Sequence, residues 1–346
     1  MLKKMAVAVA LVLVLAACSN RSRMVLYTWS DMFPQEILTE FEKETGIRIR
    51  YVNFEQNETM FAMLKAARGG RYDLVIADDY MVENVISEGL AKRLDISLLS
   101  NYGNINPIYQ KQFYDPTDGY TIPYGAGVQT IVYDPQRAGI QINGYNELWN
   151  PALEQKLGII DNFRVINGMA LKVMGQSYNT NNLDMIQAAG EFLKTLAPNI
   201  RLIRDDRLED ELVSGEIAAA VMYTSNATTA KMERPDLEVV FPREGIGFGI
   251  MPAFIPANAP NADAAYAFLN YILDAERGAL CFMELGYYST FSASDRFIDP
   301  ELRDALTLPE DFRNFDAMEM IQNISPEAEE MHSRIWTEFK AAAGRD

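Results

Sequence analysis

Apolar and polar positions follow two different rhythms in the first quarter of the chain. Three short runs, mostly apolar or apolar at every second position, have the length and composition of β-strands: residues 24–29, 47–54 and 72–77. Between and after them, apolar residues recur at helical spacing in three stretches bounded by typical helix-end residues: 34–46, 57–70 and 81–87. Asn57 stands where it can cap the second of these helices. This alternation of strand and helix predicts a parallel, doubly wound α/β sheet.

The same rhythm returns later in the chain, with no flexible linker between the halves. Strands are expected at residues 159–160 and 218–223, and helices at residues 186–196, 264–273 and 327–343. A length of 346 residues favours two domains, and the missing linker indicates that short crossing strands join them. Candidate crossing strands are residues 129–134 and 247–255. We expect two doubly wound α/β lobes, formed by residues 24–128 with 251–297 and by residues 129–250 with 298–346.

The N-terminus has the layout of a bacterial lipoprotein signal peptide. Two lysines precede an apolar run from Met5 to Ala16, and two small residues stand directly before Cys18. The run is shorter than the roughly 20 residues that span a bilayer; the alternative is a buried N-terminal helix. We expect residues 1–17 to be removed and residues 18–23 to form a tether whose Cys18 carries lipid. The working domain is then periplasmic or at the cell surface, and only this end attaches it to the membrane.

Cysteine content and charge narrow the range of functions. Once Cys18 is lipidated, Cys281 is the one cysteine left, so no intramolecular disulfide can form. The formal net charge of −17 argues against binding nucleic acid and against electrostatic adhesion to anionic lipid. It suits a cationic ligand, although solubility is the simpler explanation of the acidity.

Three predicted strand-to-helix loops hold candidate ligand-binding residues: 29–32, 77–80 and 161–164. In open parallel sheets, ligands bind beyond the carboxyl ends of the strands, where such loops lie. Two of the loops combine an aromatic ring with carboxylates, Trp29 with Asp31 and Tyr80 with Asp78 and Asp79. A ring face attracts a cation by about 0.5 to 2 kcal/mol and a carboxylate supplies the opposite charge, so these loops favour a cationic ligand. The alternative is that the aspartates only cap the helices that follow.

Ten segments, beginning with Leu26-Tyr27-Thr28-Trp29-Ser30-Asp31, share their order and spacing with a known family: 26–31, 41–47, 57–59, 72–75, 122–124, 169–171, 198–199, 255–259, 268–271 and 286–287. In these segments the chain resembles the spermidine/putrescine-binding proteins, and they span nearly all of it after the predicted signal. The resemblance implies the architecture of type II periplasmic binding proteins, two hinged lobes that close on one ligand without catalysis. It also implies that the ligand, a polyamine, passes to an ABC permease and its ATPase.

The resemblance further implies a ligand pocket, from which this chain departs in several places. The residues that match pocket residues of the family are Trp29, Ser30, Asp31, Tyr80 and Tyr287. Asp78 stands where a serine is usual, and Tyr223 where a tryptophan is usual. The second lobe's usual acids are replaced by Asn162, Val165, Asn226 and Met251, and Gly249 replaces a tryptophan beside the last of them.

These replacements leave the far end of a diamine without its usual partner. A buried ammonium that lacks a partner costs about 3 to 5 kcal/mol, or two to three decades in affinity. Three outcomes stay open. Other acids take over, with Asp31, Asp78 and Asp79 at one end and Asp161 or Glu244 at the other; the ligand is cationic at one end only; or the cargo is another small solute. A polyamine is the leading hypothesis.

Other functional classes fit the sequence less well. With His332 as the one histidine, no histidine-based triad, two-histidine zinc site or Cys/His pair is expected, so we predict neither an enzyme nor a bound metal or cofactor. The glycines at 245, 247 and 249 lack the pattern of a dinucleotide-binding loop and are expected in hinge backbone. Ferric-ion binding through Tyr287 and Tyr288 is a minor alternative. A receptor that serves sensing or adhesion fits the same sequence features as one that serves transport, and a monomer is expected.

Overall fold

The computed structural model describes residues 23–30, 32–204, 207–285, 288–300 and 318–344. The strands are β1 (Arg23–Thr28), β2 (Arg48–Asn53), β3 (Leu74–Ile76), β4 (Thr121–Tyr133), β5 (Leu157–Ile159), β6 (Ile200–Ile203), β7 (Ala219–Tyr223), β8 (Glu238–Val240), β9 (Ile246–Phe254), β10 (Tyr288–Ser289) and β11 (Met318–Met320). The helices are α2 (Gln35–Thr45), α3 (Asn57–Ala66), α4 (Asp79–Ser87), α5 (Pro135–Ala138), α6 (Phe163–Val173), α7 (Leu183–Lys194), α8 (Leu208–Ser214), α9 (Thr224–Glu233), α10 (Ala262–Ile272), α11 (Ala275–Leu285) and α13 (Pro326–Ala342). The predicted signal peptide, Cys18, Asp31 and Tyr287 lie outside the described residues.

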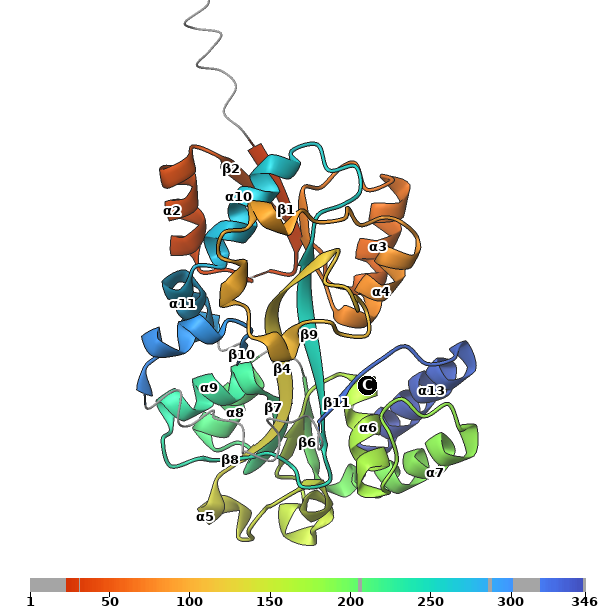
Figure 1. Ribbon diagram of the computed structural model, residues 1–346. Coiled ribbons are helices and arrows are strands. Elements are labelled where there is room, and N and C mark those ends of the chain that lie inside the picture. The colour runs from red at the N-terminus through yellow and green to blue at the C-terminus, as the bar shows by residue number, and fades with distance from the viewer. Residues whose placement is uncertain (1–22, 31, 205–206, 286–287, 301–317, 345–346) are drawn as a thin grey trace, which may run out of the picture.

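Two lobes, joined by the long strands β4 and β9, make up the molecule (Figure 1). In the first lobe β2, β1 and β3 are parallel neighbours, and β9 pairs antiparallel with β3. In the second lobe β7, β5 and β6 are parallel neighbours, and β4 pairs antiparallel with β7. Between the lobes, β4 and β9 pair with each other in the antiparallel sense. These pairings confirm the α/β fold of two lobes with crossing strands; the domain boundaries given above stay a prediction.

Each lobe buries its own apolar residues. Along β1, Leu26 joins one core cluster of the first lobe and Tyr27 joins another, because successive side chains of a strand point to opposite faces of the sheet. The first of these clusters contains Phe41 and Phe268, whose rings meet edge to face with centroids 5.0 Å apart. The second lobe has its own large cluster around β5 and β7. Full burial of one such side chain contributes about 1.5 to 3 kcal/mol to the free energy of unfolding. Each lobe is therefore stabilised by its own hydrophobic core.

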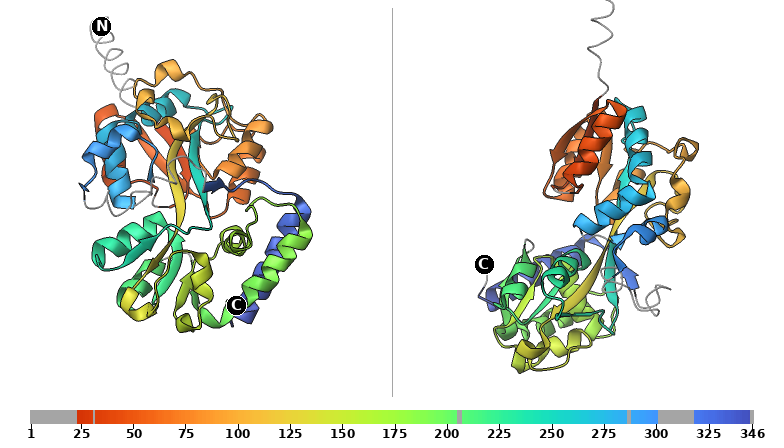
Figure 2. Two further views of the ribbon diagram at one scale, coloured as in Figure 1. Left: turned by 60° about the horizontal axis from the view of Figure 1, so that its bottom comes forward. Right: turned by 90° about the vertical axis from the view of Figure 1, so that its left-hand side faces the viewer.

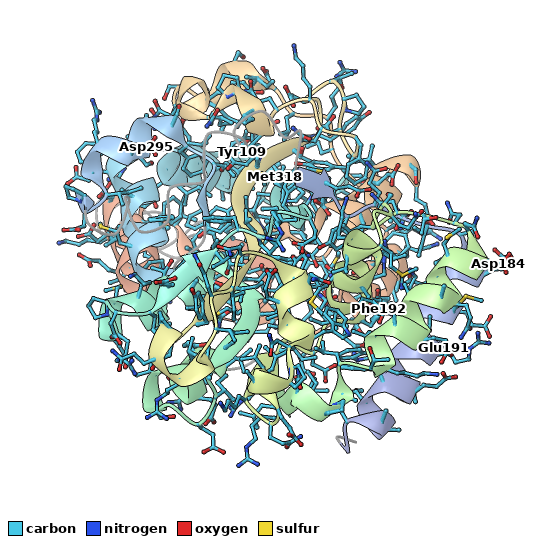
Figure 3. All side chains as sticks on the ribbon, turned by 90° about the horizontal axis from the view of Figure 1, so that it is seen from below. Tyr109, Asp184, Glu191, Phe192, Asp295 and Met318 are labelled. Atoms are coloured by element: carbon cyan, nitrogen blue, oxygen red, sulfur yellow. The ribbon has the colours of Figure 1, made fainter. Side chains whose placement is uncertain are left out.

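Helices α6, α7 and α13 pack together on the second lobe. Figure 3 shows Asp184 and Glu191 on the outer side of α7, both of them exposed. On the inner side, Gly190 lets α13 come close, because a Cβ at this position would lie 2.7 Å from the side chain of Ile335. The histidine of this bundle, His332 on α13, is fully buried. The helix predicted at residues 327–343 is therefore present as α13.

The register of the crossing strands determines which ends of the lobes face each other. β3 runs towards the second lobe, since its last residue, Ile76, pairs with Ala253 of β9. β7 runs towards the first lobe, since its last residue, Tyr223, pairs with Gln129 at the point where β4 leaves β9. The carboxyl ends of the parallel strands of both lobes therefore point to their junction, the edge at which such sheets bind ligands.

A third segment, which the sequence pattern did not predict, also connects the lobes. β11 pairs in parallel with β9 and leads into α13 (Figure 2, left view). Its Glu319 forms a 2.5 Å ion pair with Lys172 of α6, in the second lobe. Asn323 then donates to the Tyr80 carbonyl and to the Glu83 carboxylate of α4, in the first lobe, both at 3.0 Å. Within the part of the chain that the structure describes, no helix is long and apolar enough to cross a membrane.

Candidate ligand-binding site between the lobes

Trp29 and Ser30 follow β1 at the junction of the lobes. The half-buried Trp29 ring packs on Phe54, with ring centroids 4.9 Å apart. The Tyr51 hydroxyl donates to the Trp29 carbonyl (2.7 Å) and accepts from the Met32 N–H (3.2 Å). One tyrosine thus holds this loop on both sides of position 31, while Ser30 is exposed.

Asp78 and Tyr80 follow β3 and are joined by a residue that the sequence analysis assigned to another role. The Asn57 side-chain amide donates to the Asp78 carboxylate (2.7 Å) and to the Tyr80 hydroxyl (3.1 Å). The prediction that Asn57 caps α3 is wrong: the capping position is Gln56, and Asn57 is the first helical residue. Its amide instead orients two predicted site residues, and nothing in the local sequence pattern signals this contact.

Asp79 connects the first lobe to a crossing strand. One of its carboxylate oxygens accepts from the Tyr80 N–H (2.7 Å), and the other accepts from the Ile250 N–H of β9 (2.9 Å). The side chain is 3% exposed. Asp78 occupies the capping position of α4, but its side chain makes no capping bond. The alternative that these aspartates only cap helices is therefore wrong for Asp78, and Asp79 has a second partner outside its helix.

Both carboxylates lack a basic partner within the described residues. Burial raises the pKa of Asp78 to about 6; the Asn57 hydrogen bond opposes this shift and the charge of Glu58 adds to it. Burial also raises the pKa of Asp79 well above its usual range, against the hydrogen bond from Ile250. A carboxylate removed from water without a cation is costly. The pair therefore provides a place where a cation would be strongly favoured.

The second lobe contributes uncharged polar groups at the same junction. Asn162 caps α6 by accepting from the Val165 N–H (3.2 Å), and its amide donates to the Tyr223 hydroxyl (3.2 Å). Asn226, in the first turn of α9, donates to the Glu209 carboxylate of α8 at 2.7 Å. Val165 is fully buried in the core of its lobe.

Two glycines bring the two halves of the site onto one surface. Gly127 of β4 and Gly249 of β9 pair directly, so their Cα–H positions face the same side of the strand pair. A Cβ at Gly249 would lie 3.7 Å from the Asp79 carboxylate, and a Cβ at Gly127 would lie 3.7 Å from the Tyr223 ring. An acid of the first lobe and an aromatic ring of the second therefore flank the same bare stretch of backbone.

The acids that the sequence analysis offered for the second lobe are engaged elsewhere. Asp161 accepts from the Trp336 indole N–H (2.9 Å) and lies 3.7 Å from the Lys340 ammonium, both on α13. Glu244 accepts two backbone N–H groups, of residues 145 and 146, at 3.0 Å each. Neither is free to hold a ligand at the junction.

The structure thus places the predicted site residues unequally. It brings Trp29, Asp78 and Tyr80 to the junction from one lobe, and Asn162 and Tyr223 from the other. Asn226 lies one helical turn beyond Tyr223. Met251, two residues after Gly249 on the same face of β9, packs into the first lobe's core and is 9% exposed. Within the described residues no group of three or more His, Cys, Asp or Glu could hold a metal ion.

Two α/β lobes whose ligand-binding edges meet at crossing strands define the class of periplasmic binding proteins. The chain belongs to the family described as bacterial extracellular solute-binding protein, because its residues 36–308 match the sequence profile of that family. Membership confirms the expectation of a binding protein rather than an enzyme.

Individual relatives agree with the resemblance seen in the sequence. The spermidine/putrescine-binding periplasmic proteins of Salmonella typhimurium and Escherichia coli are 32% and 31% identical over 339 residues, which cover 96% of this chain and 96% of each relative. The solved structure of a spermidine/putrescine ABC transporter substrate-binding protein from Streptococcus pneumoniae, in complex with calcium and HEPES, has a TM-score of 0.83 to this chain. It is 26% identical, and the match covers 93% of this chain and 99% of that one.

Proposed function

We propose that this protein is the extracytoplasmic receptor of an ABC importer and that it binds a polyamine between its two lobes. The observation that carries the proposal is the adjacent pair Asp78, half-buried, and Asp79, buried, at the ligand-binding edge without a basic partner within the described residues. The names of the relatives, which are spermidine- and putrescine-binding proteins, point to the same ligand class.

An ammonium group supplies the positive charge that Asp78 and Asp79 lack. Hydrogen bonds between an ammonium and a carboxylate are roughly twice as strong as neutral ones, and the opposite charge favours the ionised carboxylate. Tyr80 follows the two acids directly in the sequence and Trp29 lies in the loop after the neighbouring strand β1, and both rings offer faces to a cation. We propose Trp29, Ser30, Asp31, Asp78 and Tyr80 of the first lobe and Asn162, Tyr223, Asn226, Met251 and Tyr287 of the remaining chain as the ligand-binding set.

Release and recapture of the ligand follow from the hinge. A ligand that contacts both lobes stabilises the closed arrangement over the open one by the difference in its affinity for the two. We propose that the closed, loaded monomer delivers the amine to a permease, and that lipid on Cys18 keeps it at the membrane.

Calorimetric titration of the purified protein with putrescine, spermidine and spermine tests the proposal. We expect one amine to bind per protein, with a matching rise in thermal stability, since a ligand at 100 times its Kd adds about 2.7 kcal/mol to the free energy of unfolding. Absence of both heat and thermal stabilisation with all three amines would refute the ligand class.

Amine affinity should fall in acid. An ammonium binds the ionised form of Asp78, and the pKa of this group is about 6 before binding. Below that pH a proton must leave Asp78 before the amine can bind, so affinity is expected to drop by up to about tenfold per pH unit as the pH falls below 6. Titrations between pH 5 and 8 measure this dependence. The Asp78→Asn variant is the control, since its weaker affinity should lose much of this slope; a flat profile in the unaltered protein would speak against ammonium contact with Asp78.

Trp29→Ala should weaken amine binding by about three- to thirtyfold, the range that corresponds to a cation–π contact of 0.5 to 2 kcal/mol. Trp149→Ala is the matched control. The Trp149 ring stacks on Phe192 of α7 with centroids 4.5 Å apart, in the second lobe's outer layer, so its loss should lower stability and leave affinity unchanged. Equal affinities of the two variants would show that Trp29 is not in the pocket.

A further inference from the structure

The second lobe needs a carboxylate if the ligand has a second cationic end. Its residues at the junction, Asn162, Tyr223 and Asn226, are all uncharged, and Asp161 is bound to α13. One carboxylate nevertheless touches this group directly, because Glu209 accepts the 2.7 Å hydrogen bond from Asn226.

The fold explains why Glu209 reaches the junction. α8 follows β6 and α9 follows β7, and these strands run in parallel through β5. The first turns of both helices therefore lie at the carboxyl edge of the second lobe's sheet, the edge that faces the first lobe. Glu209 is in the first turn of α8 and Asn226 is in the first turn of α9, and the two helices pack against each other.

Glu209 also differs from the two acids that follow it on α8. Asp210 forms an ion pair with Arg207 (2.6 Å), and Glu211 forms one with Arg204 (2.9 Å). Glu209 has no basic partner within the described residues, and only one of its oxygens, the one facing Asn226, accepts a hydrogen bond there. Its side chain is partly buried. The nearby basic residues thus neutralise its neighbours and leave its charge unmatched.

We propose that Glu209 is the specificity-determining carboxylate of the second lobe, which receives the second ammonium of a diamine or longer polyamine while Asn226 orients it. This inference rests on the proposed function and deepens it. In this proposal the first ammonium binds at Asp78 and Asp79, beside Gly249, and the second binds in the lobe whose Tyr223 adjoins Gly127. The site therefore discriminates between amines by the number of their charges.

The experiment compares putrescine with 1-aminobutane, which has the same carbon chain and one ammonium fewer, on the full-length protein in detergent. Glu209→Gln keeps the size of the side chain and an oxygen that can accept from Asn226. It should weaken putrescine binding by about ten- to a hundredfold, the cost of losing a hydrogen bond to a charged group, and change 1-aminobutane binding by less than threefold. Asp210→Asn, in the same helical turn but paired with Arg207, is the matched control and should leave both affinities unchanged.

The Asn226→Ala variant tests whether Asn226 orients Glu209 or contacts the ligand itself. It should weaken putrescine less than Glu209→Gln does, and it should have little further effect in the Glu209→Gln background, because the two residues act through one contact. An unchanged ratio of putrescine to 1-aminobutane affinity in Glu209→Gln would overturn the role of Glu209 and leave the receptor intact. If the unaltered protein binds neither amine and no polyamine, the proposed function itself fails, and this inference with it.

Discussion

Asp78→Asn is expected to weaken polyamine binding by about two to three decades and, at the same time, to stabilise the unliganded protein at neutral pH. The loss follows because the ammonium would keep its buried position but lose a charged partner, a change that costs about 3 to 5 kcal/mol. Calorimetry measures the affinity, and urea unfolding without ligand measures the stability.

The gain in stability follows from the sign of the pKa shift. Asp78 has a pKa of about 6 in the folded protein, above its ordinary value of 3.8. Such a group contributes most to stability below pH 3.8, and that contribution is lost as the pH rises through 6. Asparagine removes this penalty, so the unfolding free energy at pH 7 should rise by roughly 3 kcal/mol, and the gain should vanish near pH 4.

Asp115→Asn provides the contrast. The Asp115 carboxylate is buried in the first lobe, and it accepts backbone hydrogen bonds from residues 119, 120 and 121 at 2.8 to 3.0 Å. Its loss should destabilise the fold at pH 7. If Asp78→Asn also destabilised the unliganded protein at pH 7, Asp78 would be an acid that stabilises the fold rather than one that binds a cationic ligand.

His332 should make the protein sensitive to acid between pH 6.5 and 4. Burial lowers the pKa of this histidine to about 4, with a smaller contribution from the charge of Arg164. In this range the unfolded chain binds a proton that the folded chain excludes, so stability is present above pH 6.5 and is lost as the pH falls to 4, by about 3 kcal/mol. Asn167 donates to the His332 ring (3.1 Å) and carbonyl (2.9 Å), which holds the neutral side chain in place.

His332→Gln isolates this effect. Urea unfolding of both proteins at several pH values gives the difference in their unfolding free energies. The unfolding free energy of the unaltered protein minus that of the variant should be largest at pH 7, and this difference should fall by about 3 kcal/mol towards pH 4. A difference that stays constant across this range would mean that His332 does not titrate with unfolding.

The sequence was most informative where structure depends on local pattern. The strand and helix rhythm located β1 to β3 and the helices between them, and the absence of a linker pointed to crossing strands. β11 was not predicted from the sequence because Met318–Met320 is three residues long with a charged residue at its centre, and because its partner β9 lies far away in the chain. Length and alternation carry no signal in so short a strand.

Long-range side-chain contacts were the part of the site that the sequence did not reveal. Asn57 looked like a helix cap by its type and position, but its amide serves Asp78, twenty-one residues later in the chain. The bond between Asn226 and Glu209 joins two helices through their tertiary packing. By contrast, Trp29, Asp78 and Tyr80 could be proposed from the sequence, because residues at the carboxyl ends of parallel strands occupy the edge at which such folds bind ligands.

A crystal structure of the protein with spermidine tests the central claim most directly. The account predicts the amine enclosed between the lobes, with one ammonium nitrogen about 2.7 to 2.9 Å from the Asp78 carboxylate, the distance typical of such charged pairs. Spermidine bound outside the junction, or an enclosed ligand whose ammonium groups leave Asp78 and Asp79 without a cation, would contradict it.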